Sequence, residues 1–175
     1  VRHVGDFIRL RANFYDIKVN IEDNYSKLID KQIEVHKHQE NVRDLLFQSK
    51  RSIKDTTIIG RYLTLTFNDI VDLFEQAMTT HYDYELIAKE YGQTGVLKDF
   101  KHLLLKIANE LDHLAYQLNA NKAPKPLFNF KDVDFTIDYM QGQQLDYNQT
   151  MVTSNLAGIL SFYAYVLIAP ATASF

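Results

Sequence analysis

Apolar residues recur in steps of three and four along most of the chain, a spacing that predicts amphipathic helices. The pattern is clearest in residues 20–51, where a heptad seam runs over four repeats. Asn20 is suited to cap this helix, because Asn accepts a hydrogen bond from a first-turn amide. Polar members of the seam favour packing inside a bundle over an autonomous coiled coil. The seam positions are Tyr25, Leu28, Gln32, Val35, Gln39, Val42, Leu46, Ser49 and Ile53.

Two further segments carry helical patterns. Residues 56–91 present a broad apolar face, and residues 96–121 carry an unbroken seam from Leu97 to Leu118. The short Gly-Gln-Thr-Gly connection between them, with Thr94 as the expected N-cap, predicts that the second helix folds back antiparallel to the first. The predicted fold is all-α, an elongated antiparallel bundle whose three long helices span residues 20–51, 56–91 and 96–121.

The first 17 residues form an additional amphipathic stretch, in which Phe7, Leu10, Phe14 and Ile17 make one helical stripe. Arginines are interspersed with these apolar residues. A basic amphipathic segment fits a membrane surface, and it fits equally a short docking helix with solvated arginines. The arginines are Arg2, Arg9 and Arg11.

The prolines and the distribution of charge together divide the chain into three parts. Residues 1–122 form the expected helical bundle domain, which two prolines in Ala123-Pro-Lys-Pro126 terminate. Residues 123–146 alternate in polarity and are interpreted as a linker rather than a strand, because no partner strand is visible. Residues 147–175 contain no Asp, Glu, Lys, Arg or His. The apolar part of this tail fits either a membrane-associated segment or a buried core helix.

Composition narrows the functional classes. The chain of 175 residues contains no Cys, which excludes disulfide frameworks, thiolate zinc sites and cysteine nucleophiles. Its net charge of −3 argues against a nucleic-acid-binding domain, which is usually basic. Gly and Pro are few, with 6 and 3 residues, which favours long helices over loop-rich or all-β designs.

The sharpest catalytic pattern is Glu110-Leu-Asp-His113, because Glu and His at this spacing share a helix face in di-iron carboxylate bundles. Such a site needs a second Glu-x-x-His, and the sequence has none. The nearest acidic set on another helix could oppose it, but we interpret both sets as solvated faces opposite the apolar seams. The acidic set is Asp69, Asp72 and Glu75.

Three further histidines and three tyrosines favour packing over chemistry. His36 and His38 point to different helix faces and are poor joint ligands. His81 is interpreted as a histidine at the edge of the core. Three tyrosines that offer a flat-ligand surface are interpreted as packing residues. We therefore predict no catalytic, cofactor-binding or metal-ligating residue, no cofactor and no enzymatic activity. The three tyrosines are Tyr82, Tyr84 and Tyr91.

Several short sequence motifs, taken in order along the chain, resemble the soluble region of YccS/YhfK-type bacterial inner-membrane proteins. These proteins belong to the fusaric-acid-resistance and aromatic-acid-exporter group. The similarity covers residues 1 to about 118, and the sequence departs from the family pattern after about residue 140. The motifs are Ala12-Asn-Phe-Tyr-Asp16, His36-Lys-His-Gln-Glu-Asn-Val-Arg-Asp-Leu-Leu-Phe47, Gly60-Arg-Tyr-Leu63, Asp69-Ile-Val-Asp-Leu-Phe-Glu75, Thr80-His-Tyr-Asp-Tyr84 and Gly95-Val-Leu97.

The resemblance implies a helical region on the cytoplasmic face of the inner membrane, flanked by two blocks of membrane helices. Val1 would follow the first block. The resemblance assigns no functional residue. The function it implies is a non-catalytic domain that couples, gates or assembles the membrane blocks of an efflux-type transporter, with an organic or aromatic acid as the expected substrate.

Two alternatives stand beside this function. One is an interaction bundle without a transport role, in which the seams at 25–53 and 97–118 supply a homo-oligomer interface. The other is a carboxylate-bridged metal enzyme. For the transporter domain, the expected partner is the membrane. For the interaction bundle, it is a second copy of the chain. No nucleic-acid partner is expected.

Overall fold

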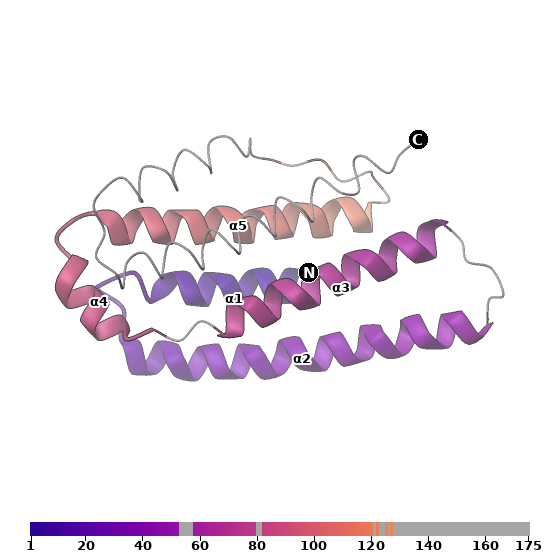
Figure 1. Cartoon of the computed structure of the whole chain (residues 1–175), viewed down its shortest axis with the longest axis horizontal. Helices are drawn as coiled ribbons and strands as arrows, with labels where there is room; N and C mark the ends of the chain where they lie inside the picture. The colour runs from indigo at the N-terminus through magenta and orange to yellow at the C-terminus, as the bar shows by residue number, and fades with distance from the viewer. Residues whose placement is uncertain (53–57, 80–81, 121, 123–124, 126, 128–175) are drawn as a thin grey trace.

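The described part of the chain is entirely helical. The computed structural model describes residues 1–52, 58–79, 82–120, 122, 125 and 127. These residues form five α-helices and no strand, so the all-α prediction is confirmed for them. Figure 1 shows the longer helices lying along one axis and the short α4 at one end. The helices are α1 (Arg2–Asn13), α2 (Ile21–Ser52), α3 (Ile58–Thr79), α4 (Tyr84–Tyr91) and α5 (Val96–Asn119).

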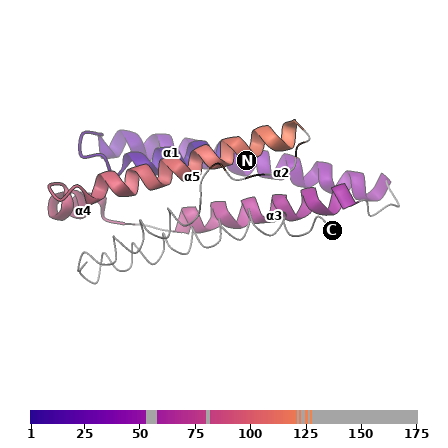
Figure 2. The same cartoon turned by 90° about the horizontal axis from the view of Figure 1, so that it is seen from above.

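The N-terminal helix α1 occupies the centre of the bundle. It packs along α5 and α2 and also contacts α3, and Figure 2 shows α3 on the side opposite the α1–α5 pair. Gly5 allows the close approach to α5, because a Cβ at this position would lie 3.3 Å from the carbonyl oxygen of Ala108. The predicted bundle of three long helices is therefore incomplete, since its core is built around a fourth, shorter helix.

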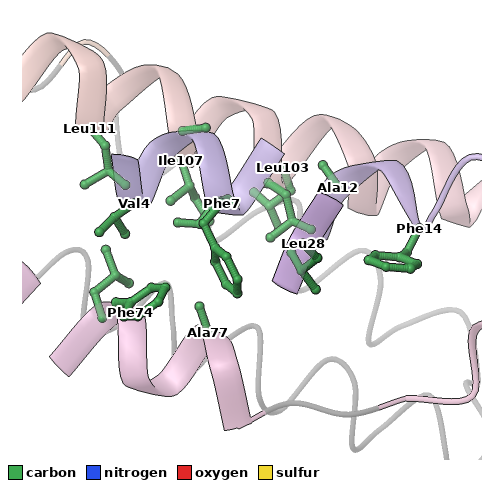
Figure 3. Close-up of a cluster of buried hydrophobic side chains, with 14 of the residues drawn as sticks. Val4, Phe7, Ala12, Phe14, Leu28, Phe74, Ala77, Leu103, Ile107 and Leu111 are labelled. Atoms are coloured by element: carbon green, nitrogen blue, oxygen red, sulfur yellow. The ribbon is translucent and has the colours of Figure 1, made fainter. Parts of the chain in front are cut away.

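Side chains from α1, α2, α3 and α5 meet in one hydrophobic core (Figure 3). Phe7 of α1 lies edge-on to Phe74 of α3, with ring centroids 4.9 Å apart. Ile107 and Leu111 of α5 close the opposite side, and each is almost fully buried. The burial of these apolar faces is the main force that holds the helices together.

Helix α2 matches its prediction within one residue at each end. The side-chain oxygen of Asn20 accepts a hydrogen bond from the amide of Asp23 at 3.0 Å, which confirms the predicted cap. Leu28 and Val35 of the seam are buried within the chain's own core, whereas Val42 is 41% exposed. The seam therefore packs inside a bundle over its first half, as expected.

The prediction of one helix over 56–91 is wrong. Helix α3 ends at Thr79, and α4 begins at Tyr84. Asp83 caps α4 by accepting a hydrogen bond from the amide of Leu86 at 3.0 Å, and its ψ of 88° is not helical. The apolar face continues across the break, so the period of the sequence does not reveal it. The predicted core-edge histidine, His81, lies outside the described residues.

Helix α5 begins one residue later than its predicted cap implies. Gly95 stands at the N-cap position with a φ of 81°, a conformation that favours glycine. Thr94 supports the turn instead, because its hydroxyl donates to the carbonyl of Tyr91 at 2.8 Å. The α5 seam is buried from Leu97 to Leu114, as predicted, and Figure 1 shows α5 antiparallel to α3.

Two described residues that follow α5, Lys125 and Leu127, contact that helix. The amide of Lys125 donates to Oε1 of Gln117 at 3.0 Å, and Nε2 of Gln117 donates to the carbonyl of Lys125 at 3.2 Å. The rest of the predicted linker at 123–146, apart from Lys125 and Leu127, and the whole predicted tail at 147–175 lie outside the described residues. Among the helices that are described, none combines the length and apolar character of a membrane span.

Candidate functional site

Glu110 of the Glu-x-x-His pattern is buried and hydrogen-bonded to the backbone, whereas the sequence predicts a solvated side chain. Its residue is 1% exposed, and the backbone amide of Leu127 donates to its two carboxylate oxygens at 2.9 and 3.0 Å. The expectation that Glu110 lies on a solvated face is therefore wrong. The carboxylate satisfies the backbone amide of Leu127, which is a structural role.

The acidic set on α3 does not join Glu110 or His113 in a metal-type cluster within the described part of the chain. Asp72 and Glu75 are exposed, as predicted. Asp69 is half-buried, and this burial, with the nearby charge of Asp72, raises the pKa of its carboxyl. The geometry thus gives no support to a carboxylate-bridged centre.

The tyrosines predicted to be packing residues lie in or against the hydrophobic core, Tyr84 within it and Tyr82 and Tyr91 partly buried against it. Tyr84 is buried and stacks on Phe14, the C-cap residue of α1, with ring centroids 4.4 Å apart. Tyr15 lies edge-on to Tyr84 at 5.6 Å, and burial raises the pKa of both phenols. The face of Tyr84 is covered by the chain's own aromatic rings, which leaves no room there for a flat ligand.

Arg11 is the main exception to the expectation of solvated arginines. It is buried, and its guanidinium donates to the carbonyl oxygen of Ala77 and to the hydroxyl of Tyr84. Ala77 lies in the last turn of α3, where the helix dipole favours a cation. Arg11 therefore joins α1 to the end of α3 and the start of α4.

One cluster of ligand-type side chains is assembled by the fold, and the sequence analysis does not predict it. The cluster consists of His3 on α1 and Glu34 and His38 on α2. Nδ1 of His3 lies 3.0 Å from Oε1 of Glu34, and Nε2 of His38 lies 4.0 Å from the same oxygen. The two imidazole rings stack with centroids 3.9 Å apart and planes 12° from parallel.

Only part of this cluster had a signal in the sequence. Glu34 and His38 are four residues apart, which places them on one helix face. His36 does not belong to the cluster. Its ring lies against that of Phe74, with ring centroids 5.2 Å apart. His3 comes from another helix, and nothing in the local pattern links it to α2.

A neighbouring cation orients the carboxylate of Glu34 and favours its ionised form. Nζ of Lys31 lies 2.6 Å from Oε2 of Glu34, and this hydrogen bond lowers the pKa of Glu34 and raises the pKa of Lys31. Lys31 also lies 3.6 Å from Asp6, which pairs with Arg9. Burial lowers the pKa of His3, and the neighbouring His38 lowers it further. The lowered pKa favours the neutral imidazole.

An apolar pocket of about 270 Å³ adjoins the cluster, between α2 and α3 at the N-terminal end of α1. Val35, Phe67 and Ile70 are among its apolar lining residues, and His3, His38, Gln39 and Thr66 are among its polar ones. Gln39 is 9% exposed, and its Nε2 has no hydrogen-bond partner among the described residues. The pocket offers an apolar surface bordered by two imidazoles and one amide.

A comparison with protein families places the chain. A family model described as FUSC-like inner membrane protein yccS matches residues 1–167. The chain belongs to this family. A search of curated proteins and a search of solved structures each returned no match.

Membership confirms the resemblance and extends it. The match continues to residue 167, so the expectation that the similarity ends near residue 118, with a departure after about 140, is wrong. Most of the uncharged tail belongs to the family pattern. The FUSC-like family is an inner-membrane family of transporter type, which places the protein in a membrane context.

Proposed function

We propose that this chain forms the cytoplasmic helical domain of an inner-membrane, efflux-type protein and couples or assembles its membrane blocks without catalysis. The observation that carries the proposal is the central position of α1, which packs against α5, α2 and α3. In this proposal, a membrane block of the parent protein precedes this helix, as the family resemblance implies. A helix that leaves the membrane and enters the core of a bundle is suited to mechanical coupling.

The contacts of α1 support this role. Phe7 and Ile8 are 1% and 2% exposed, so the helix cannot shift without repacking the core. Charged contacts hold its flanks, since Arg9 pairs with Asp112 of α5. Arg11 holds the end of α3. A displacement of α1 therefore reaches every long helix of the domain. The aromatic or amphipathic acid as substrate rests on the family resemblance alone.

The location is tested by labelling. Because the chain contains no Cys, a single Cys introduced at exposed Lys37 is the only reactive thiol it contributes. In intact cells that make the full-length parent protein with other thiols removed, we expect no reaction with a membrane-impermeant maleimide until the inner membrane is permeabilised. Labelling of intact spheroplasts from outside would contradict the cytoplasmic location. A Cys in a known periplasmic protein is the positive control.

The coupling role is tested by export. Phe7→Asp in the full-length protein should break the core around α1 and abolish export or resistance, while membrane insertion persists. The matched control is Lys37→Asp, which places the same charge on the exposed face of α2. Unchanged export with Phe7→Asp, or with the whole domain deleted, would refute coupling.

An interaction bundle remains the second candidate, because α2 carries an exposed apolar stripe. Ile29 and Ile33, one helical turn apart, are 55% and 62% exposed. The stripe lies outside the seam that packs against α1 and is available to a second copy. Sedimentation of the purified protein over a concentration series should show a stable oligomer, which Ile33→Glu dissociates. A monomer at all concentrations excludes this candidate.

A further inference from the structure

We propose that His3, Glu34 and His38 form a binding site for a divalent transition-metal cation, for which Zn²⁺ is the probe. The site goes beyond the proposed function and depends on none of it. One ligand atom from each of the three side chains lies within 4.8 Å of the other two. Two imidazoles and one carboxylate are a ligand set that Zn²⁺ and its neighbours in the first transition row favour.

The backbone holds the three ligands on rigid elements. Glu34 and His38 share one face of α2, four residues apart, and His3 stands on α1, which packs along α2. Sites on helices keep ligand positions better than sites on loops. A cation bound here would tie α1 to α2 and leave a coordination position open to water or to a ligand in the adjoining pocket.

The carboxylate is arranged for a second positive partner. Lys31 holds Oε2 of Glu34 at 2.6 Å, whereas Oε1 faces the imidazoles of His3 and His38. A cation at Oε1 therefore does not have to displace Lys31. Lys31 is a positioning residue here, because it orients the carboxylate without contacting the cation, as partners of metal ligands commonly do.

The histidines provide the remaining donors. Nδ1 of His3 is buried and has no aligned hydrogen-bond partner in the described part of the chain, although it lies 3.0 Å from Glu34. A buried nitrogen without a partner is unfavourable, and a metal ion removes that cost. The side chain of His38 is 50% exposed, which leaves its ring free to turn.

One movement accompanies binding. The nitrogen lone pairs of an imidazole lie in the ring plane, so two rings stacked 12° from parallel cannot both point at one ion. The exposed ring of His38 must turn out of the stack, whereas His3 and Glu34 keep their places. Metal binding should therefore change the environment of His38 more than that of Glu34.

The test measures Zn²⁺ binding to the purified, untagged full chain, because a histidine tag would bind the metal itself. We expect one Zn²⁺ per chain by titration calorimetry, retained in elemental analysis after dialysis. Zn²⁺ should raise the unfolding temperature, because it binds the folded state. His38→Gln and Glu34→Gln should each lower the affinity at least about tenfold and abolish the rise.

A matched control and a spectroscopic reading separate this site from surface binding. His102→Gln removes an exposed imidazole of α5 and should leave the affinity unchanged. Co²⁺ should give the strong visible absorption of a four- or five-coordinate site, and the signal should disappear in His38→Gln. His38 is half-exposed, so this variant should fold, which circular dichroism checks. Two outcomes would overturn the proposal. One is equal Zn²⁺ affinity of wild type, His38→Gln and His3→Gln, and the other is weak, non-stoichiometric binding, that is, an adventitious ion only.

Discussion

The guanidinium of Arg11 donates a hydrogen bond to the hydroxyl of Tyr84 at 3.0 Å, joining two residues that are 73 positions apart. The same guanidinium donates to the carbonyl of Ala77, in the last turn of α3. One buried cation thus connects the central helix to the end of α3 and the beginning of α4. This connection is formed at the point where the long apolar pattern of residues 56–91 divides into two helices.

Arg11→Met should destabilise the protein by about 2–4 kcal/mol, because it leaves a buried carbonyl and a buried hydroxyl without this donor. Urea unfolding followed by circular dichroism measures the change in the free energy of unfolding. Arg2→Met, at an exposed position of the same helix, should change it by less than about 0.5 kcal/mol. Equal effects of the two substitutions would show that Arg11 has no special structural role.

A second prediction tests the packing of α3 with two leucines of one helix. Leu73 is 1% exposed and Leu65 is 62% exposed. Leu73→Ala should cost about 2–5 kcal/mol because it opens a cavity in the core, whereas Leu65→Ala should cost less than about 1 kcal/mol. The measurement is the urea midpoint of each variant at constant denaturant slope. Similar losses at both positions would contradict the packing of α3 against α1.

A third prediction concerns the buried carboxylate of Glu110. Glu110→Gln should cost about 1–3 kcal/mol, because an amide group replaces an oxygen that accepts from the amide of Leu127. Hydrogen exchange at the Leu127 amide should accelerate, while exchange in the middle of α2 stays unchanged. Glu90→Gln, at an exposed position of α4, is the control. A loss of bound metal in Glu110→Gln alone would revive the carboxylate-bridged enzyme.

A fourth prediction uses the ion pair between Asp16 and Lys101. Nζ of Lys101 lies 2.7 Å from Oδ2 of Asp16. The hydrogen bond from Lys101, and next the one from the amide of Lys18, lower the pKa of Asp16 below its ordinary 3.8. The lowered pKa favours the ionised carboxylate in the folded state. Its contribution to stability is therefore present above that ordinary pKa and is lost as the pH falls through the lowered value.

Asp16→Asn should consequently reduce the free energy of unfolding at pH 7 by less than about 1 kcal/mol, because the pair is partly exposed. The difference from wild type should vanish toward pH 2. Urea unfolding at a series of pH values measures both limits. Asp44→Asn, an exposed position on α2, supplies the comparison. A wild-type advantage that persisted unchanged at pH 2 would show that the carboxylate's charge is not its source.

Local rules were sufficient for much of the fold. The period of the apolar residues and the cap at Asn20 located α2, and the seam from Leu97 located α5, because both signals are contained within one helix. The amphipathic stripe through Phe7 indicated a helix before residue 17 as well. The sequence could not show that this short helix is the centre of the bundle, since its length and charge equally fit a surface.

The sequence by itself thus determined the helical class, the course of the longest helices and the family resemblance. Tertiary structure alone decided the environment of the charged groups. Arg11 and Glu110 look like solvated side chains in their own helices, yet packing buries both and gives them backbone partners. His3 meets Glu34 and His38 only because α1 lies along α2. The reason is physical: helical period depends on neighbours in sequence, whereas burial and ligand clusters depend on which helices pack together.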